Sequence, residues 1–132
     1  MLMSLRVGTN DIAKARAFYN ATFGALGAGS SIVPEASPIA MYKLPDGPMF
    51  LVGPAANGEP ATHANGGTLL FIAANEGEVD AWYKGGMAHG GICEGAPGPR
   101  AQINNKYGAY MRDPDGNKLG CYVGNLFAQM SG

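Results

Sequence analysis

The sequence carries little charge and no surplus of either sign. Of its 132 residues, nine are Lys or Arg and ten are Asp or Glu, so charged residues make up 14% and the formal net charge is −1. Proteins that bind nucleic acid or anionic membranes through a broad electrostatic field need a surplus of basic residues. We therefore expect neither nucleic acid nor a membrane as a partner.

Long apolar runs and paired cysteines are also lacking. No stretch approaches the roughly 20 apolar residues that cross a bilayer, and residues 1–7 lack the basic-then-apolar order of a signal peptide. Cys93 and Cys121 are too few for a disulfide framework. These features predict a cytoplasmic protein with reduced thiols. Because 46% of the residues are hydrophobic, the composition excludes intrinsic disorder.

Glycine and proline are plentiful, with 21 and 9 residues, and they separate short periodic segments. Alternating or continuous apolar residues predict strands at 2–8, 39–44, 49–52, 68–74, 91–94, 107–112 and 118–123. Apolar residues at helical spacing predict helices at 11–25 and 76–86, the second ended by Gly85 and Gly86. A polar linker is expected at 54–67 and a loop at 97–105.

The order of elements occurs twice, which suggests an internal repeat. Leu44-Pro45-Asp46-Gly47 and Asp113-Pro114-Asp115-Gly116 occupy matching turns, and Phe18-Tyr19 matches Trp82-Tyr83 in the two helices. The alternative is that Pro-Asp-Gly recurs because it is a common turn. We expect the helical aromatic residues to pack in the core rather than to bind a cofactor.

Two motifs at opposite ends of the chain resemble a known family. Val7-Gly8-Thr9-Asn10-Asp11, leading into Ala15-Arg16-Ala17-Phe18-Tyr19, resembles the opening of the vicinal oxygen chelate superfamily, and residues 107–118 resemble its closing hairpin. That superfamily includes glyoxalase I, bleomycin- and fosfomycin-resistance proteins and extradiol dioxygenases. The resemblance implies an α+β fold, in which two βαβββ modules form a curled eight-stranded mixed sheet around a concave cavity, with the helices on the outer face.

The resemblance covers almost the whole chain. It implies one domain over residues 1–132, with module one at about 1–55, the linker at about 54–67 and module two at about 67–125. It also implies a dimer, and the thin charge coat of the chain points to the same symmetric self-association.

A divalent metal in the cavity is a further implication of the resemblance. Its ligands, commonly His and Glu, would come from the first and last strands of each module. The corresponding positions are Ser4, Leu51, Thr68 and Gly120. Glycine and leucine offer no donor atom, and lone hydroxyls are poor ligands. We therefore predict no metal and no other cofactor.

Arg6 is unusual because it lies inside a short apolar strand. It shares a face with Ser4, which the resemblance places in the cavity. A buried arginine needs hydrogen-bond partners, and its planar guanidinium suits a carboxylate, phosphate or enolate oxygen of a ligand. The alternatives are an arginine at the cavity rim or one paired with an internal acid.

Strand alternation extends this candidate site. It places Tyr122 and Lys118 on the cavity side and separates Tyr110 and Arg112 from a core-facing Ala109 and Met111. The predicted pocket is mostly apolar with a few hydroxyls, as small-molecule sites usually are. The predicted ligand-binding residues are Arg6, Thr68, Tyr110, Tyr122, Met49 and Leu70.

Other reactive side chains fit structural roles. His63 and His89 fall in loops and are expected to be exposed, a catalytic base being the alternative. Cys121 alternates with Gly120 along its strand, so its side chain should point away from the cavity and pack towards a helix as a small apolar residue. Asp113 and Asp115 should bond the backbone of their own turn.

Three functions remain open. The first is a glyoxalase/bleomycin-resistance-like protein that binds a small organic molecule, anionic or aromatic, without a metal. The second is a metal-dependent lyase or dioxygenase of the glyoxalase type. The third is a metal-free isomerase or lyase that uses a Tyr or His base. The sequence assigns no catalytic residue.

Overall fold

The computed structural model describes residues 1–45 and 47–130, and it is an α+β fold. The first half contains β1 (Ser4–Gly8), α1 (Ile12–Ala25), β2 (Ala40–Lys43) and β3 (Met49–Gly53). The second half contains β4 (Leu69–Ala73), α2 (Glu76–Ala88), β5 (Ile92–Arg100), β6 (Lys106–Arg112) and β7 (Lys118–Val123). A short 3-10 helix at Ala101–Ile103 lies between β5 and β6, and another at Ala128–Met130 follows β7.

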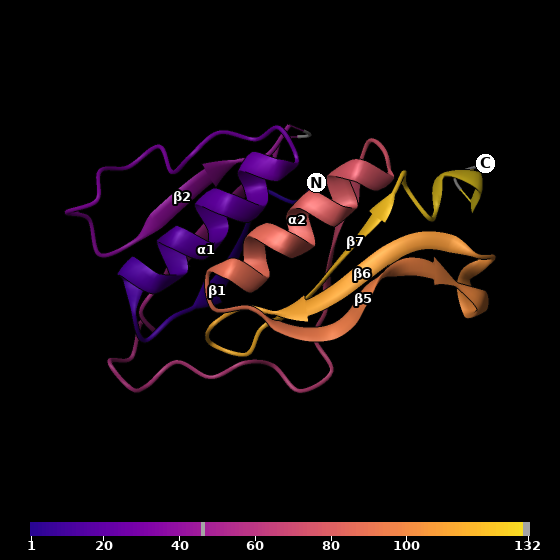
Figure 1. Ribbon diagram of the computed structural model, residues 1–132. Coiled ribbons are helices and arrows are strands. Elements are labelled where there is room, and N and C mark those ends of the chain that lie inside the picture. Colours follow the sequence, from indigo (N-terminus) through magenta and orange to yellow (C-terminus); the bar gives the residue numbers. More distant parts are fainter. Residues whose placement is uncertain (46, 131–132) are drawn as a thin grey trace.

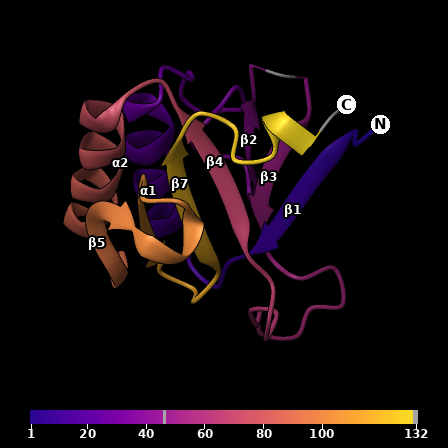
Figure 2. The same cartoon turned by 90° about the vertical axis from the view of Figure 1, so that its right-hand side faces the viewer.

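The strands form two sheets of related topology. One has the order β1-β3-β2 and the other β4-β7-β6-β5. In each sheet the strand before the helix pairs in parallel with the last strand, and the other neighbours are antiparallel. The two helices lie side by side on one face of these sheets (Figure 1), and the strands present their other face away from both helices (Figure 2).

The expected single curled sheet of eight strands is wrong, because the described residues form seven strands in two sheets. The missing strand belongs to the first half, where residues 27–38 contain neither helix nor strand. The buried guanidinium of Arg16 donates hydrogen bonds to the carbonyls of Val33 (3.1 Å), Pro34 (3.2 Å) and Ile39 (2.9 Å). These carbonyls therefore have partners without a neighbouring strand.

Strand β5 is longer than the sequence predicted. The loop expected at 97–105 begins instead as strand residues up to Arg100, despite Pro97 and Pro99. Strand β5 lies at the edge of its sheet, and its register with β6 shifts twice along its length. An edge strand with bulges tolerates residues that cannot donate to the ladder.

Helix α2 also continues beyond its predicted end. Gly85 and Gly86 lie inside the helix rather than ending it. A Cβ added at Gly86 would lie 2.1 Å from the Cε of Met111 and 3.0 Å from the Cε2 of Phe18. The glycine therefore lets the helix approach β6 closely, which is a packing reason for a residue that disfavours helix.

The helical aromatic side chains fill the core, as predicted. Phe18, Tyr19 and Trp82 are at most 1% exposed, and Tyr83 is half-buried. The ring of Phe23 on α1 lies 5.1 Å from Phe50 of β3 and 5.4 Å from Phe71 of β4, edge to face in both cases. One aromatic cluster thus connects the two sheets.

The predicted turns join their strands. Gly47 (φ +110°) donates a backbone hydrogen bond to Leu44 in the β2–β3 hairpin; Asp46, the central residue of that prediction, lies outside the described residues. Asp11 caps α1 by accepting a hydrogen bond from the backbone N–H of Lys14 at 3.1 Å.

Candidate functional site

A cleft of about 370 Å³ lies where the two halves of the chain meet. Strand β1 forms one wall, and the other walls come from the linker and from the residues that begin β4 and β7. Among the described residues, two cationic side chains and no carboxylate line this cleft. Its lining residues are Leu5, Arg6, Val7, Gly8, Thr62, Ala64, Gly67, Thr68, Leu69, Asn117 and Lys118.

Arg6 lies on the face of β1 that points away from the core. Its neighbours Leu5 and Val7 are half-buried against the core, whereas the arginine is exposed. Its Nη2 donates a hydrogen bond to the carbonyl of Pro54 at 2.8 Å. In the described part of the chain the ion pair is that of Arg112 with Glu94, so Arg6 has no internal acid as partner. Arg6 is therefore exposed at the rim of the cleft, and its pairing with an internal acid is not observed among the described residues.

Asn10 holds the linker wall in place. Its side-chain amide donates to the carbonyl of Ala61 (3.0 Å) and its Oδ1 accepts from the N–H of the same residue (2.7 Å). Its own N–H donates to the carboxylate of Asp115 at 2.9 Å. One residue, through its side chain and its backbone N–H, thus ties the linker to the β6–β7 turn, and both border the cleft.

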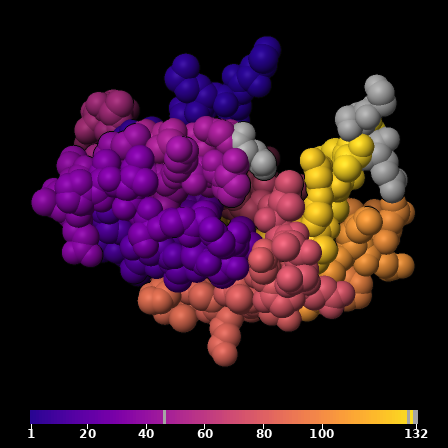
Figure 3. All heavy atoms as spheres, turned by 90° about the horizontal axis from the view of Figure 1, so that it is seen from above, coloured from indigo at the N-terminus to yellow at the C-terminus, as the bar shows by residue number. Residues whose placement is uncertain are grey.

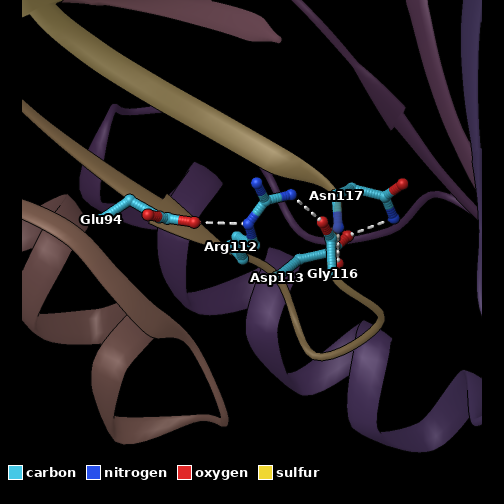
Figure 4. Close-up of polar contacts among 5 residues, drawn as sticks. All are labelled: Glu94, Arg112, Asp113, Gly116 and Asn117. Carbon is cyan, nitrogen blue, oxygen red and sulfur yellow. Dashed lines mark hydrogen bonds and ion pairs between the residues drawn. The ribbon is translucent and has the colours of Figure 1, made fainter. Parts of the chain in front are cut away.

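The β6–β7 turn is organised by a buried carboxylate. Asp113, which is 1% exposed, accepts from the Asn117 amide (2.8 Å) and from the N–H groups of Asp115 and Asn117 (2.9 Å each). Figure 4 shows this turn together with Arg112, which donates to the carbonyl of Gly116 at 2.7 Å and pairs with Glu94. The predicted turn role of this aspartate is confirmed.

The same turn also connects the two halves, which the sequence did not predict. The hydroxyl of Tyr19 on α1 donates to Asp113 at 2.5 Å, and the Asn117 amide donates to the carbonyl of Gly8 at 3.3 Å. Burial raises the pKa of Asp113, although its hydrogen bonds oppose this. Burial and the adjacent carboxylate together raise the pKa of Tyr19. Because Asn117 also lines the cleft, this hydrogen-bond network extends to the cleft wall.

Two tyrosines lie beyond the cleft on the open face of the second sheet. Tyr122 is 1% exposed and its hydroxyl donates to that of half-buried Tyr110 at 2.9 Å. The Nζ of Lys118 lies 5.5 Å from the centre of the Tyr110 ring. Seen from above, the side opposite the helices is hollowed between the N-terminal residues and the C-terminal segment (Figure 3).

The structure brings part of the predicted ligand-binding set together. Arg6 and Thr68 line the cleft. Leu70, Tyr110 and Tyr122 belong to the adjoining face of the second sheet, where Tyr110 and Leu70 lie opposite each other across Gly120. Met49 is half-buried on β3 and is outside the cleft lining.

Asn117 and Thr62 are cleft residues that the sequence reasoning left out. Asn117 follows the Asp-Pro-Asp-Gly turn directly and precedes the first residue of β7, so its place at this end of the strand was open to prediction from the turn. Thr62 comes from an aperiodic linker, which carries no signal of where its side chains lie.

The four positions that the resemblance assigns to a metal do not offer a matching donor set. Ser4 and Thr68 contribute single hydroxyls and Leu51 contributes none. A Cβ added at Gly120 would lie 2.6 Å from the Cδ2 of Leu70 and 2.7 Å from the Cε1 of Tyr110, so these two side chains already fill the space there. Within residues 1–45 and 47–130, no three His, Cys, Asp or Glu side chains gather in a way that could hold a metal ion.

The histidines and cysteines are not among the residues that line the cleft, although His63 lies between the lining residues Thr62 and Ala64. His63 is exposed and packs over Gly116, and His89 is exposed at the end of α2, as expected of loop histidines. Both cysteines are free thiols; Cys93 is exposed, whereas burial raises the pKa of Cys121 to about 12. No helix in the described part of the chain is long and apolar enough to span a bilayer.

Comparison with known proteins agrees with this architecture. The family model of the Glyoxalase/Bleomycin resistance protein/Dioxygenase superfamily matches residues 2–120. The chain belongs to this superfamily. The resemblance seen in the motifs of the sequence is therefore confirmed. Among curated proteins, none matches the chain.

Solved structures of this superfamily share the fold. A glyoxalase/bleomycin resistance protein from Albidiferax ferrireducens T118 is 39% identical, with a TM-score of 0.83 over 95% of this chain and 99% of that one. A lactoylglutathione lyase from Agrobacterium tumefaciens is 26% identical, with a TM-score of 0.65 over 97% and 96%. A glyoxalase-related enzyme from Fulvimarina pelagi is 18% identical (TM-score 0.75, 94% and 88% covered), which is a likeness of fold alone.

Proposed function

We propose that this superfamily member binds a small organic anion, without a metal, in the cleft between its two halves. The observation that carries the proposal is the pair of cations, Arg6 and Lys118, in a cleft that no carboxylate lines. Hydroxyls of Thr62 and Thr68 and the amide of Asn117 add neutral donors, and leucine and valine side chains supply apolar walls. This is the mixture that a carboxylate or phosphate on a small apolar body requires.

The charge distribution of the whole sheet layer supports an anionic ligand. The strands contain one acidic residue, Glu94, and it is paired with Arg112. Acidic side chains are instead found on α2 and in the turns and loops. The basic residues of the strands are Arg6, Lys43, Arg100, Lys106, Arg112 and Lys118. The protein is nearly neutral as a whole, yet its strands are strongly basic.

A metal-dependent lyase is the second candidate function. The 26% identity to a lactoylglutathione lyase favours it. The side chains at positions 4, 51, 68 and 120 weigh against it, because neither leucine nor glycine can donate to a metal and the space above Gly120 is taken by Leu70 and Tyr110.

Isothermal titration with benzoate, and with benzylamine as the cationic counterpart, tests the proposed binding. We expect benzoate but not benzylamine to bind. Arg6→Ala and Lys118→Ala should each weaken benzoate binding about tenfold, since a hydrogen bond to a charged group contributes roughly 1.5–3 kcal/mol. Lys84→Ala, which removes an exposed cation of α2, is the control. Equal binding of both probes, or unchanged affinity in Arg6→Ala, would contradict the proposal.

We also propose that two copies of the chain form a symmetric homodimer. Exposed apolar side chains support this: Leu2 and Met3 before β1, Leu70 and Ile72 on β4, and Phe127 near the C-terminal end are 41–84% exposed. Sedimentation equilibrium should give twice the monomer mass, and Ile72→Lys should lower it towards the monomer. A monomer at micromolar concentration would contradict this assembly.

The organisation of the chain and its compartment are further parts of the proposal. We propose that residues 1–132 act as one domain, because the cleft takes its walls from both halves. The exposed free thiol of Cys93 supports a reducing, cytoplasmic environment.

A further inference from the structure

The surface above Gly120 is built by two side chains that need the glycine. Leu70 of β4 and Tyr110 of β6 stand on either side of Gly120 in neighbouring strands and share the same face. Both would come within 2.7 Å of a Cβ at this position, and the Tyr110 ring is rigid. A residue larger than glycine at position 120 would therefore displace Tyr110 from its observed position.

A second glycine fixes the partner of Tyr110. The ring of Tyr122 lies over Gly108, where an added Cβ would be 2.5 Å from two ring carbons. The two tyrosine rings meet edge to face at 5.7 Å, and Tyr122 donates its hydroxyl hydrogen to the Tyr110 oxygen at 2.9 Å. The described residues offer no acceptor for the hydroxyl hydrogen of Tyr110, so this hydrogen is available for a hydrogen bond to a ligand.

Tyr110 is also next to the proposed anion site. Lys118 lines the cleft, and its Nζ lies 5.5 Å from the centre of the Tyr110 ring. Lys118 and Gly120 are two residues apart on one strand, so their side-chain positions are roughly 7 Å apart on the same face. A ligand held at the cleft by its anionic group can thus extend towards the Tyr110 hydroxyl.

We propose that Tyr110, positioned by Tyr122, donates a hydrogen bond to a neutral acceptor oxygen, such as a carbonyl, on the far part of the bound anion. The specificity of the cleft is then for a small anion that carries a second, carbonyl-like oxygen. This inference rests on the proposed function of the cleft. Tyr110 would contact the ligand, and Tyr122 would act as a positioning residue.

Titration calorimetry with benzoate and two acetylated derivatives tests this inference. Benzoate carries the anion alone, and 3- and 4-acetylbenzoate add a neutral carbonyl at two distances. The wild type should bind the better acetylbenzoate roughly 2- to 10-fold more tightly than benzoate, which is the range for one net hydrogen bond. Tyr110→Phe should abolish this preference, so that benzoate and the acetylbenzoates bind this variant with similar affinity. Tyr107→Phe is the matched control and should retain the preference, because the Tyr107 hydroxyl donates to Asp80 of α2.

The positioning role has its own readout. Tyr122→Phe should reduce the ratio of acetylbenzoate to benzoate affinity, because the Tyr110 hydroxyl loses its fixed orientation. Gly120→Ala should remove the preference as well, by displacing Tyr110, and thermal unfolding verifies that each variant is folded.

The failures are distinguishable. If wild type binds benzoate but gains nothing from the acetyl group, or if the gain survives in Tyr110→Phe, the inference is overturned and the anion site stands. If benzoate does not bind at all, the proposed function fails and the inference fails with it.

Discussion

The two cysteines illustrate how burial separates side chains of the same type. Cys93 is exposed on β5, whereas Cys121 on β7 is 0% exposed and its pKa is raised to about 12. The thiolate is the nucleophile that attacks a disulfide reagent, so Cys121 is protected both by its burial and by its raised pKa. We predict that a disulfide reagent at pH 8 modifies one thiol in the folded protein and two after denaturation. Cys93→Ser should show no fast reaction; a fast reaction in that variant would contradict the packing of β7.

The buried pair of Tyr19 and Asp113 predicts a loss of stability at alkaline pH. The pKa of Tyr19 is raised in the folded state, so above pH 10 the unfolded chain loses this proton while the folded chain keeps it. The stabilising contribution is therefore complete below pH 10 and falls as the pH rises towards the raised pKa. We expect the free energy of unfolding from urea titrations to decrease between pH 9 and pH 11.

Tyr19→Phe should weaken this dependence and lower stability at pH 7 by about 1.5–3 kcal/mol, the usual contribution of a hydrogen bond to a charged group. Tyr107→Phe removes an exposed hydroxyl and should leave most of the slope in place. The account of this pair is wrong if both variants show the wild-type slope.

At the scale of elements, glycines set how closely strands and helices approach. Gly98 of β5 and Gly108 of β6 are direct cross-strand partners with different surroundings. A Cβ at Gly108 would overlap the ring of Tyr122, whereas one at Gly98 would meet only Arg100 at 3.6 Å. We predict that Gly108→Ala costs about 1–3 kcal/mol in chemical denaturation, as overpacking does, and that Gly98→Ala is close to neutral. Similar losses for both variants would contradict this packing.

The sequence predicted most elements because their apolar residues are periodic and their ends carry turn or cap residues. It missed the continuation of α2 through Gly85 and Gly86, since the reason is the tight approach of Met111 from a distant strand. It also missed the proline-containing half of β5, which an edge position permits. At the end of α2 and in the second half of β5, tertiary contacts override the structure that the local sequence favours.

The candidate site was predictable in part for the same reason. Alternation places Arg6, Lys118 and Tyr110 on the open face, and the structure agrees. What joins the halves, namely the contacts of Asn10 with the linker and of Tyr19 with Asp113, links residues far apart in the chain. No local pattern of the sequence reports such contacts.

At the scale of the whole molecule, fold and charge point to the same face. Both helices cover one side of the two sheets (Figure 2), and the strands carry basic side chains that are balanced elsewhere in the chain. The cleft between the halves is where this basic layer meets apolar walls and neutral donors. The fold of the superfamily is thus retained, while positions 4, 51, 68 and 120 hold serine, leucine, threonine and glycine instead of histidine or glutamate.

The affinity for benzoate before and after treatment with EDTA tests this central claim most directly. The account predicts the same dissociation constant in both preparations, no gain on adding Mn²⁺, Ni²⁺ or Zn²⁺, and a loss of about tenfold in Arg6→Ala, as expected when one strong hydrogen bond to a charged group is removed. Binding that disappears with EDTA and returns with a stoichiometric divalent metal would contradict it.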